Sequence, residues 1–377
     1  TNGATGDATV VNATALVLDT STVGGNLNAT ATTGNLTDNN VLTVGGTAGF
    51  TTSAADADIV LGQLAVTGLV DVQTTGDATV VNTIALGLDT STVGGDLDAT
   101  ATTGNLTDAG VVTVGGTAGF TTSAADADIL VDQLAATGLV DVQTGATGDA
   151  TVVNATALVL DTSTVGGNLN ATATTGNLTD NNVLTVGGTA GFTTSAADAD
   201  IVVNQLAVTG DVDVHTNGAN GDATVVNTIA LDLATSAVGG NLDATATTGN
   251  LTDAGVVTVG GTAGFTTSAA DADIVLGQLA VTGLVDVQTT GDATVVNTIA
   301  LGLDTSTVGG DLDATATTGN LTDAGVVTVG GTAGFTTSAA DADILVDQLA
   351  ATGLVDVQTG ATGDATVVNA TALVLDT

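Results

Sequence analysis

The chain has 377 residues and carries 40 acidic side chains, no Lys or Arg and a single His, which gives a formal net charge of -40. Without cationic side chains it cannot neutralise phosphate, so nucleic-acid binding is excluded and an anionic membrane surface repels the chain. The absence of Cys excludes disulfides, thiolate metal sites and thiol nucleophiles, and no apolar run reaches the ~18 residues that membrane insertion needs.

The chain is a tandem repeat. The string GFTTSAADADI occurs five times, with spacings of 70, 72, 73 and 70 residues between its copies of Phe50, Phe120, Phe192, Phe265 and Phe335. Residues 43–162 are identical to residues 258–377, and the chain begins and ends at the same phase of its repeat. We therefore expect residues 1–377 to form a single continuous solenoid that is a segment of a longer repeat array.

Each repeat divides into three where an Asp or Asn opens an apolar stretch. In chain order these residues are Asp7, Asn35, Asp56, Asp77, Asn105, Asp126, Asp149, Asn177, Asp198, Asp222, Asn250, Asp271, Asp292, Asn320, Asp341 and Asp364. Steps of 21–28 residues are typical of one coil of a solenoid. The spacing predicts about 16 coils of 21–28 residues, with three coils per ~71-residue repeat.

The local pattern predicts strands. Val70 and Val72 alternate with the polar residues Asp71 and Gln73, which is the period of a strand with one buried face. The chain is rich in Thr, Val and Gly, which are poor helix formers. The fold class that follows is all-β, a right-handed parallel β-helix (β-solenoid).

Aligning the three coils predicts how the core is filled. The alignment places Val72, Ala99 and Phe120 at the same inward position of successive coils, so that each large ring has a small neighbour. The Asp and Asn ladder is interpreted as a repeated corner, because both residues tolerate left-handed backbone. Gly pairs such as Gly94–Gly95 are interpreted as left-handed or tight corners.

Outward Asp residues are the candidate metal ligands. The alignment places Asp71 and Asp98 one coil apart at the same register, about 4.8 Å from each other. Two further pairs repeat this arrangement, and the complete candidate set is Asp71, Asp98, Asp213, Asp243, Asp286 and Asp313. All-oxygen sites suit Ca²⁺, although the GGxGxD repeat of calcium-binding solenoids is absent. Loose screening by Ca²⁺ or other divalent cations is the alternative, and no cofactor is required.

Nothing in the sequence indicates an enzyme. The Asp pairs recur with the repeat, whereas an active site is singular, and no aromatic or basic side chain accompanies them. His215 stands where other copies carry Gln73 and Gln143, and it has no evident catalytic partner.

The motifs TVGGTAGFTTSAADADI, NLTDAGVVTVGG and LAVTGLVDV resemble those of bacterial β-strand-repeat surface proteins, which include filamentous-haemagglutinin-like and surface-layer-like β-solenoids. The resemblance covers the whole chain in repeat length and composition. It implies an extracellular or cell-surface location, a right-handed β-helix and a scaffolding or adhesive role.

We therefore expect an extracellular structural protein that forms a fibre, sheath or surface layer by packing of acidic β-solenoid rods. Its expected partners are further copies of itself and divalent cations. The alternative is the stalk of a giant secreted adhesin that presents a binding tip outside this segment. Ice binding through Thr rows fits less well, because Val72, Ala99 and Phe120 break the row between coils.

Overall fold

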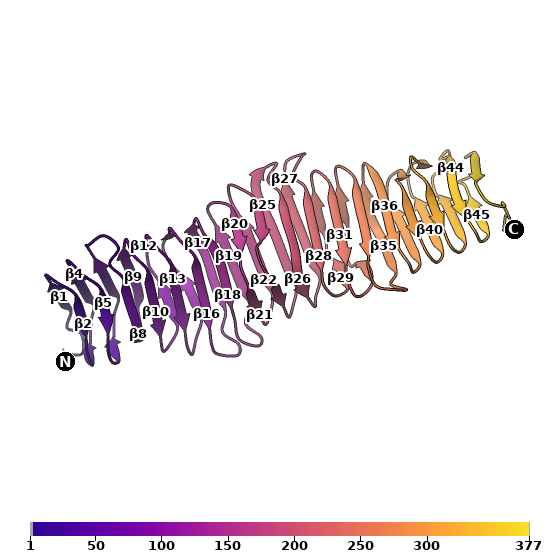
Figure 1. Cartoon of the computed structure of the whole chain (residues 1–377). Helices are drawn as coiled ribbons and strands as arrows, with labels where there is room; N and C mark the ends of the chain where they lie inside the picture. The colour runs from indigo at the N-terminus through magenta and orange to yellow at the C-terminus, as the bar shows by residue number, and fades with distance from the viewer. Residues whose placement is uncertain (1–2, 377) are drawn as a thin grey trace. The chain divides into compact units, whose positions relative to one another are not determined.

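The structure is a computed structural model that describes residues 3–376, in which we find strands and turns but no helix, and so no helix that could cross a membrane. The chain forms two compact units, Thr1–Thr189 and Ala190–Thr377. Each unit consists of strands that lie side by side in two sheets, and the chain passes from one sheet to the other at every half-turn (Figure 1). We name the sheets 1a and 1b in the first unit and 2a and 2b in the second.

The strands of the first unit alternate between its two sheets. Sheet 1a contains β1 (Ala8–Asn12), β4 (Leu27–Ala31), β7 (Ala48–Thr52), β9 (Leu69–Thr74), β11 (Leu86–Leu88), β12 (Ser91–Val93), β14 (Leu106–Asp108), β15 (Val112–Val114), β17 (Ile129–Ala136), β19 (Ala150–Asn154) and β22 (Leu169–Ala173). Sheet 1b contains β2 (Leu16–Leu18), β3 (Ser21–Val23), β5 (Leu36–Asp38), β6 (Leu42–Val44), β8 (Ile59–Val66), β10 (Ala78–Asn82), β13 (Leu97–Ala101), β16 (Ala118–Thr122), β18 (Leu139–Gln143), β20 (Leu158–Leu160), β21 (Ser163–Val165), β23 (Leu178–Asp180) and β24 (Leu184–Val186).

The second unit is built in the same way. Sheet 2a contains β25 (Ala190–Ala197), β27 (Val212–Asn217), β29 (Leu231–Leu233), β30 (Ser236–Val238), β32 (Leu251–Asp253), β33 (Val257–Val259), β35 (Ile274–Val281), β37 (Ala293–Asn297), β40 (Leu312–Ala316), β43 (Ala333–Thr337) and β45 (Val355–Gln358). Sheet 2b contains β26 (Ile201–Val208), β28 (Ala223–Asn227), β31 (Leu242–Ala246), β34 (Ala263–Thr267), β36 (Leu284–Thr289), β38 (Leu301–Leu303), β39 (Ser306–Val308), β41 (Leu321–Asp323), β42 (Val327–Val329), β44 (Ile344–Ala351) and β46 (Ala365–Asn369).

Neighbouring strands pair in parallel, one turn of chain apart. Leu27, for example, pairs with Ala48, which follows it by 21 residues. The sequence distance between paired residues ranges from 18, for Leu69 and Gly87, to 23, for Leu106 and Ile129. Parallel pairing at a fixed sequence step is the geometry of a solenoid. The expected fold class, an all-β parallel β-solenoid, is confirmed, with about 17 turns in total.

The expected division of each repeat into three coils is wrong. Phe50 lies on β7 in sheet 1a, whereas the equivalent Phe120 lies on β16 in sheet 1b, seven half-turns later. One repeat is therefore three and a half turns, and a turn takes about 20 residues. The recurring 28-residue step between corner residues is one and a half turns, and not a longer coil with an insertion. In the second unit, Phe192, Phe265 and Phe335 alternate between sheets 2a and 2b in the same way.

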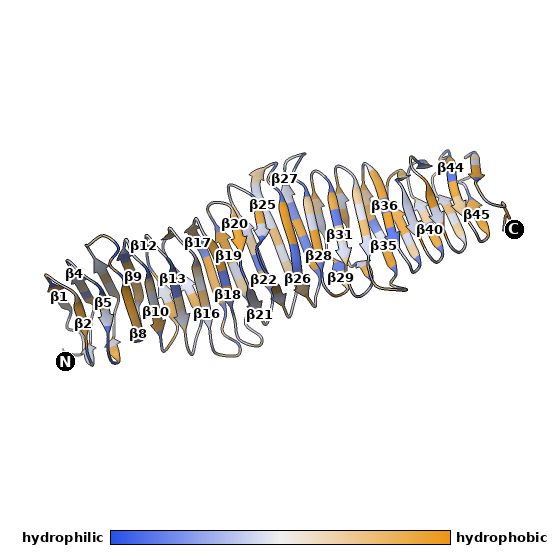
Figure 2. Cartoon of the chain, viewed as in Figure 1, coloured by the Kyte–Doolittle hydropathy of each residue, from blue (hydrophilic) through white to orange (hydrophobic). Residues whose placement is uncertain are grey.

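The core lies between the two sheets of each unit, and buried apolar residues alternate with more exposed ones along the strands. Figure 2 shows hydrophobic and hydrophilic residues alternating along many of the strands. All five Phe rings are fully buried. Phe120 pairs with Ala99 on one side and with Val142 on the other, so the expected exchange of volume between rungs is confirmed for Ala99 and Phe120. Val72, however, pairs with Phe50 in sheet 1a and has no place beside Ala99, because the two residues lie on opposite sheets.

Buried polar side chains replace backbone pairing where a ladder is interrupted. Asn82 is fully buried, and its Oδ1 accepts from the Val66 backbone N–H at 3.0 Å while its Nδ2 donates to the Val66 and Ala85 carbonyls at 2.9 and 2.6 Å. The buried Ser91 Oγ accepts from the Val72 N–H at 3.1 Å in the kink between β11 and β12. These side chains satisfy backbone groups that would otherwise be buried without partners.

The corners contain a ladder of Asp and Asn side chains, as expected, but its members differ in part. Asp58 Oδ1 accepts from the Asp77 N–H at 3.1 Å, Asp77 Oδ1 from the Asp96 N–H at 2.9 Å, and Asp96 Oδ1 from the Thr117 N–H at 2.7 Å. We call this the corner ladder. Asp56, which the sequence placed in the ladder, adopts the left-handed conformation expected of a corner residue, with φ of 54°.

Of the two conformations expected for the Gly pairs, the structure supports the tight corner and not the left-handed residue. Gly218 is the one glycine with positive φ among residues 3–376. A Cβ at Gly45 would lie 2.5 Å from the carbonyl oxygen of Gly24 one turn away. Glycine is therefore required because successive turns approach closely at this corner.

Candidate cation-binding columns

The six predicted metal ligands do not pair as the sequence suggested. Asp71 lies on β9 in sheet 1a and Asp98 on β13 in sheet 1b, so the two lie on opposite sheets of the unit. Asp213 and Asp243 are likewise separated between sheets 2a and 2b, and Asp286 and Asp313 between sheets 2b and 2a. The predicted pairing fails because equivalent positions in successive segments alternate between sheets.

The structure brings the same residues into a different arrangement. In sheet 1b, Asp98 pairs with Gly119, Gly119 pairs with Asp141, and Asp161 lies in the turn that follows. We call such an outward row an acidic column. A Cβ at Gly119 would lie 2.9 Å from Asp98 Oδ1, so the glycine leaves room for the carboxylate.

Acidic columns recur once per repeat and occur on both sheets of each unit. Their members are Asn28, Gly49, Asp71 and Asp89 in sheet 1a; Asp98, Gly119, Asp141 and Asp161 in sheet 1b; Gly191, Asp213 and Ala234 in sheet 2a; Asp243, Gly264, Asp286 and Asp304 in sheet 2b; and Asp313, Gly334 and Asp356 in sheet 2a. The six predicted residues all belong to these columns, and Asp243 shares one with Asp286.

The environment of Asp141 shows the electrostatics of a column. Burial raises the pKa of Asp141, and the charges of Asp161 and Asp98 raise it further. The Gln143 amide opposes this shift, because its Nε2 donates to Asp141 Oδ1 at 2.7 Å and to the Thr162 carbonyl at 2.9 Å. The Gln143 amide therefore stabilises the charged form of Asp141, which has no cationic partner.

The neighbouring carboxylate is shifted in the opposite direction. Asn182 Nδ2 donates to Asp161 Oδ1 at 2.6 Å, and this bond together with the Thr162 backbone N–H lowers the pKa of Asp161. In the second unit, burial raises the pKa of Asp286, the Gln288 amide lowers it, and the charges of Asp304 and Asp243 raise it. Each of these columns therefore combines a half-buried carboxylate with an adjacent one at the surface.

Sequence reasoning missed Asp89, Asp141, Asp161, Asp304 and Asp356 as column members. For Asp141 and Asp356 a signal was present in the sequence, because both, like Asp71 and Asp286, are followed two residues later by Gln. Repeat alignment alone could not find the column, since its members come from different segments of the repeat.

A single column supplies oxygen ligands but no complete metal shell. Among residues 3–376, no three acidic or His side chains come together closely enough to hold a metal ion. Carboxylate oxygens suit Ca²⁺, which takes six to eight ligands. The residues of one column therefore fit part of a Ca²⁺ shell, and the remaining ligands would have to come from water or from another molecule.

The corner-ladder carboxylates are less suited to cations. Asp77, Asp149 and Asp222 each use Oδ1 to accept a backbone N–H from the next turn, at 2.9, 2.7 and 2.7 Å. These bonds hold successive turns together at the corner. We assign the corner-ladder acids to the fold and the column acids to the candidate site.

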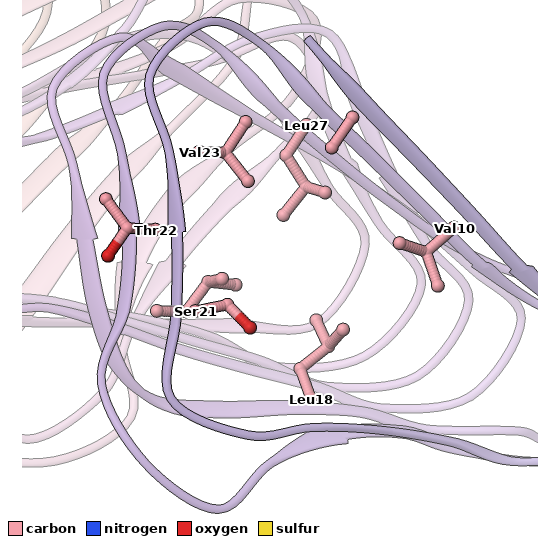
Figure 3. A pocket seen from close by; sticks show the side chains of 8 residues that line it. Val10, Leu18, Ser21, Thr22, Val23 and Leu27 are labelled. Carbon is pink, nitrogen blue, oxygen red and sulfur yellow. The ribbon is translucent and has the colours of Figure 1, made fainter. Parts of the chain in front are cut away.

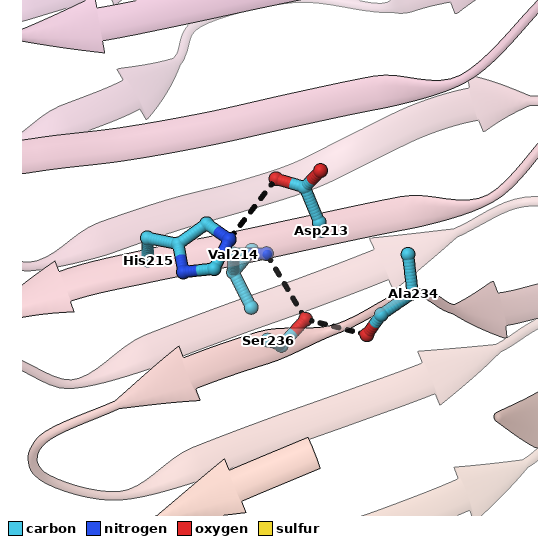
Figure 4. Close-up of polar contacts among 5 residues, drawn as sticks. All are labelled: Asp213, Val214, His215, Ala234 and Ser236. Carbon is cyan, nitrogen blue, oxygen red and sulfur yellow. Dashed lines mark hydrogen bonds and ion pairs between the residues drawn. The ribbon is translucent and has the colours of Figure 1, made fainter. Parts of the chain in front are cut away.

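The column that contains Asp213 differs from the others (Figure 4). His215 replaces the usual Gln, and its Nε2 lies 3.6 Å from Asp213 Oδ1, with both side chains about 40% exposed. Burial raises the pKa of Asp213 and the imidazole lowers it. Ala234 stands where other columns carry Asp89, Asp161 or Asp304, so this column holds one carboxylate with a weakly basic partner.

A cavity of about 310 Å³ lies in the first turn (Figure 3). Val10, Leu18, Val23 and Leu27 line it together with Ala8, Ser21, Thr22 and Leu42. Val10 is 36% exposed, whereas the equivalent Val80 is fully buried. The lining consists of core positions that are filled in later turns, so we assign this cavity to the hydrophobic core and not to a ligand site.

Parallel strands stacked from near-identical segments define the protein as a repeat-based β-solenoid. Its sequence matches the family described as repeats of unknown function (DUF5649) at residues 5–73, 75–143, 147–205, 220–288 and 290–358, and the chain belongs to this family. Comparison with curated proteins and with solved structures found no match.

Proposed function

We propose that the protein is an extracellular structural scaffold whose solenoid units pack side by side through divalent cations held between the acidic columns of neighbouring molecules. The observation that carries this proposal is the recurrence of acidic columns on both sheets of each unit in a chain without Lys or Arg. Like charges in such rows either take up protons or recruit counter-ions.

The incomplete ligand set favours bridging between molecules. A column offers a few carboxylates along one face, which is too few for the shell of a Ca²⁺ ion. A second column that faces the first would add ligands and cancel part of the repulsion between two acidic surfaces. Self-association and cation binding are then one process, and no catalytic group is needed.

The resemblance to bacterial β-strand-repeat surface proteins supports the extracellular location. A fibre, sheath or surface layer is the assembly that we propose. Under the alternative, in which the chain is the stalk of a secreted adhesin, the columns would serve solubility, and purified chains would stay separate when Ca²⁺ is added.

The test is light scattering and negative-stain electron microscopy of residues 1–377 in millimolar Ca²⁺ and in chelator. We expect ordered assemblies in Ca²⁺ that separate in chelator. Compact separate particles under both conditions would refute the scaffold, and assemblies that persist in chelator would refute cation bridging.

A pair of variants with equal charge isolates the columns. Asp141→Asn with Asp286→Asn removes two column carboxylates and should raise the Ca²⁺ concentration needed for assembly several-fold. Asp132→Gly with Asp347→Gly also removes two charges, at positions where other copies carry Gly62 and Gly277, and should leave that concentration unchanged. Equal effects of both pairs would indicate general screening and not column binding.

A further inference from the structure

One stretch of the second unit departs from the repeat. The third family match ends at residue 205 and the fourth begins at residue 220, and the chain between them contains Asp211, Asp213 and His215. Asp211 stands where other copies carry Leu69, Leu139, Leu284 and Leu354. Asp232, one turn further on, stands where two copies carry Gly87 and Gly302 and two others carry Val17 and Val159.

These two substitutions face each other across a pair of neighbouring strands. Val212 on β27 pairs with Leu233 on β29. The residues before them, Asp211 and Asp232, therefore lie opposite each other in sheet 2a. At the equivalent place in the first unit, Leu69 Cδ2 covers Gly87, since it lies 2.8 Å from where a Cβ would stand. An apolar contact in the standard repeat is therefore replaced by two Asp residues on neighbouring strands, whose backbones lie about one strand spacing apart, ~4.8 Å.

The oxygen atoms of Asp232 are not fully satisfied. Asp232 Oδ1 is buried and has no hydrogen-bond partner among the described residues. Thr252, which pairs with Asp232 from β32, donates a hydrogen bond to the carboxylate. A buried carboxylate oxygen without a donor costs free energy, and a proton on one of two facing carboxyl groups would supply the missing bond.

No cation compensates this pair. The titratable groups on the packed elements are Asp213 and His215 on β27 and Asp253 on β32. His215 pairs with Asp213, and Asp253 accepts the backbone N–H groups of Gly277 and Gln278 at 2.9 and 2.7 Å. Burial raises the pKa of Asp232, Thr252 lowers it, and the charges of Asp211 and Asp253 raise it further.

We propose that Asp211 and Asp232 form a proton-binding pair, which shares one proton in mildly acidic solution and loosens the pairing of β27 with β29 when both carboxylates are charged. The proton comes from solvent and joins the two facing carboxyl groups by a hydrogen bond. At neutral pH the like charges repel across the strands. The pair makes this rung a pH-sensitive point of the second unit, whatever the protein's role.

Hydrogen exchange measured by mass spectrometry on the whole chain tests the proposal. Peptides that contain residues 211–220 or Asp232 are unique in sequence, whereas the standard rungs around Gly87 and Gly302 give identical peptides that serve as an internal control. The ratio of the two exchange rates cancels the intrinsic pH dependence of exchange. We expect this ratio to rise several-fold between mildly acidic and neutral pH, because the charged carboxylates repel across the strands.

Two variants keep the test decisive. Asp211→Leu with Asp232→Gly restores the standard repeat and should make the ratio independent of pH. Asp232→Asn keeps the shape and supplies a permanent donor, and it should also remove the pH dependence. A ratio that stays constant with pH in the unmodified chain, or a pH dependence that persists in either variant, would overturn the proposal.

Discussion

Asn82 shows how a single side chain holds two turns together. Its amide makes three hydrogen bonds to backbone groups where the ladder between β8 and β10 shifts register, and Asn154, Asn227 and Asn297 are equally buried at equivalent positions. Burying an amide in an apolar core is tolerated when all its donors and acceptors are satisfied. The Asn82 amide thus makes the hydrogen bonds to Val66 that a paired strand would otherwise make.

We predict that Asn82→Ala lowers the free energy of unfolding by about 2–4 kcal/mol, because it leaves the Val66 N–H and carbonyl buried without partners. Urea unfolding followed by circular dichroism measures the change. Asn39→Ala, an exposed position, is the matched control and should change the free energy by less than about 0.5 kcal/mol. A loss at Asn82 no greater than that at Asn39 would contradict this account of the buried amide.

Phe120 carries the largest packing contribution at the residue scale. It is fully buried between Ala99 and Val142, and neither neighbour can fill the space that the ring leaves. We predict that Phe120→Ala costs about 3–5 kcal/mol through the resulting cavity. Val111→Ala, at a side chain 48% exposed, should cost little in the same urea titration. Similar midpoints for the two variants would show that the ring does not support the core.

At the scale of the element, the half-buried carboxylates of the columns set a pH dependence. Burial raises the pKa of Asp71, Asp141 and Asp286 above their ordinary values. The folded state then binds protons more tightly than the unfolded state, so stability falls as pH rises through the raised pKa and is regained on acidification. This direction is opposite to ordinary acid denaturation.

We therefore predict that the urea midpoint rises as the pH is lowered from about 7 towards about 4.5. Asp141→Asn with Asp286→Asn should flatten this dependence, since the neutral amide carries no charge to desolvate. The Asp132→Gly and Asp347→Gly pair should retain it. A midpoint that falls steadily on acidification would show that the column carboxylates are better stabilised as anions than the geometry indicates.

The strands also show which features of the fold could be predicted from the sequence. The alternation around Val70 and Val72 and the inward position of the Phe residues predicted parallel strands and a narrow core, and the structure confirms both. The number of turns in a repeat was predicted wrongly as three, because two three-residue strands such as β11 and β12 share one half-turn. The Ser91 side chain bridges their kink, and in sequence this segment looks like an insertion.

The pairing of the candidate site failed for the same reason. Corner motifs at the two edges of a turn look alike in sequence, because both contain Gly or Ala followed by Asp or Asn. Alignment on these motifs cannot tell a full turn from a half-turn. The candidate Asp residues lie at outward positions, as predicted, and their role as metal ligands stays a prediction, whereas their neighbours could be found only from strand register.

At the scale of the whole molecule, the formal net charge of -40 opposes compaction. We predict that NaCl raises the unfolding temperature by screening this repulsion, most steeply at low ionic strength where the Debye length is long. Ca²⁺ should raise it further than NaCl at equal ionic strength if cations occupy the columns. Differential scanning calorimetry measures both effects, and equal shifts for the two salts would argue for screening alone.

The odd number of half-turns in a repeat has a consequence for assembly. If each repeat contained an even number of half-turns, every acidic column of a unit would lie on the same side. Two such units could then pair only with each other. With seven half-turns, the columns alternate between opposite sides. If molecules pack through the columns as proposed, contact through one side leaves the other free for the next neighbour, and the packing extends as an open row.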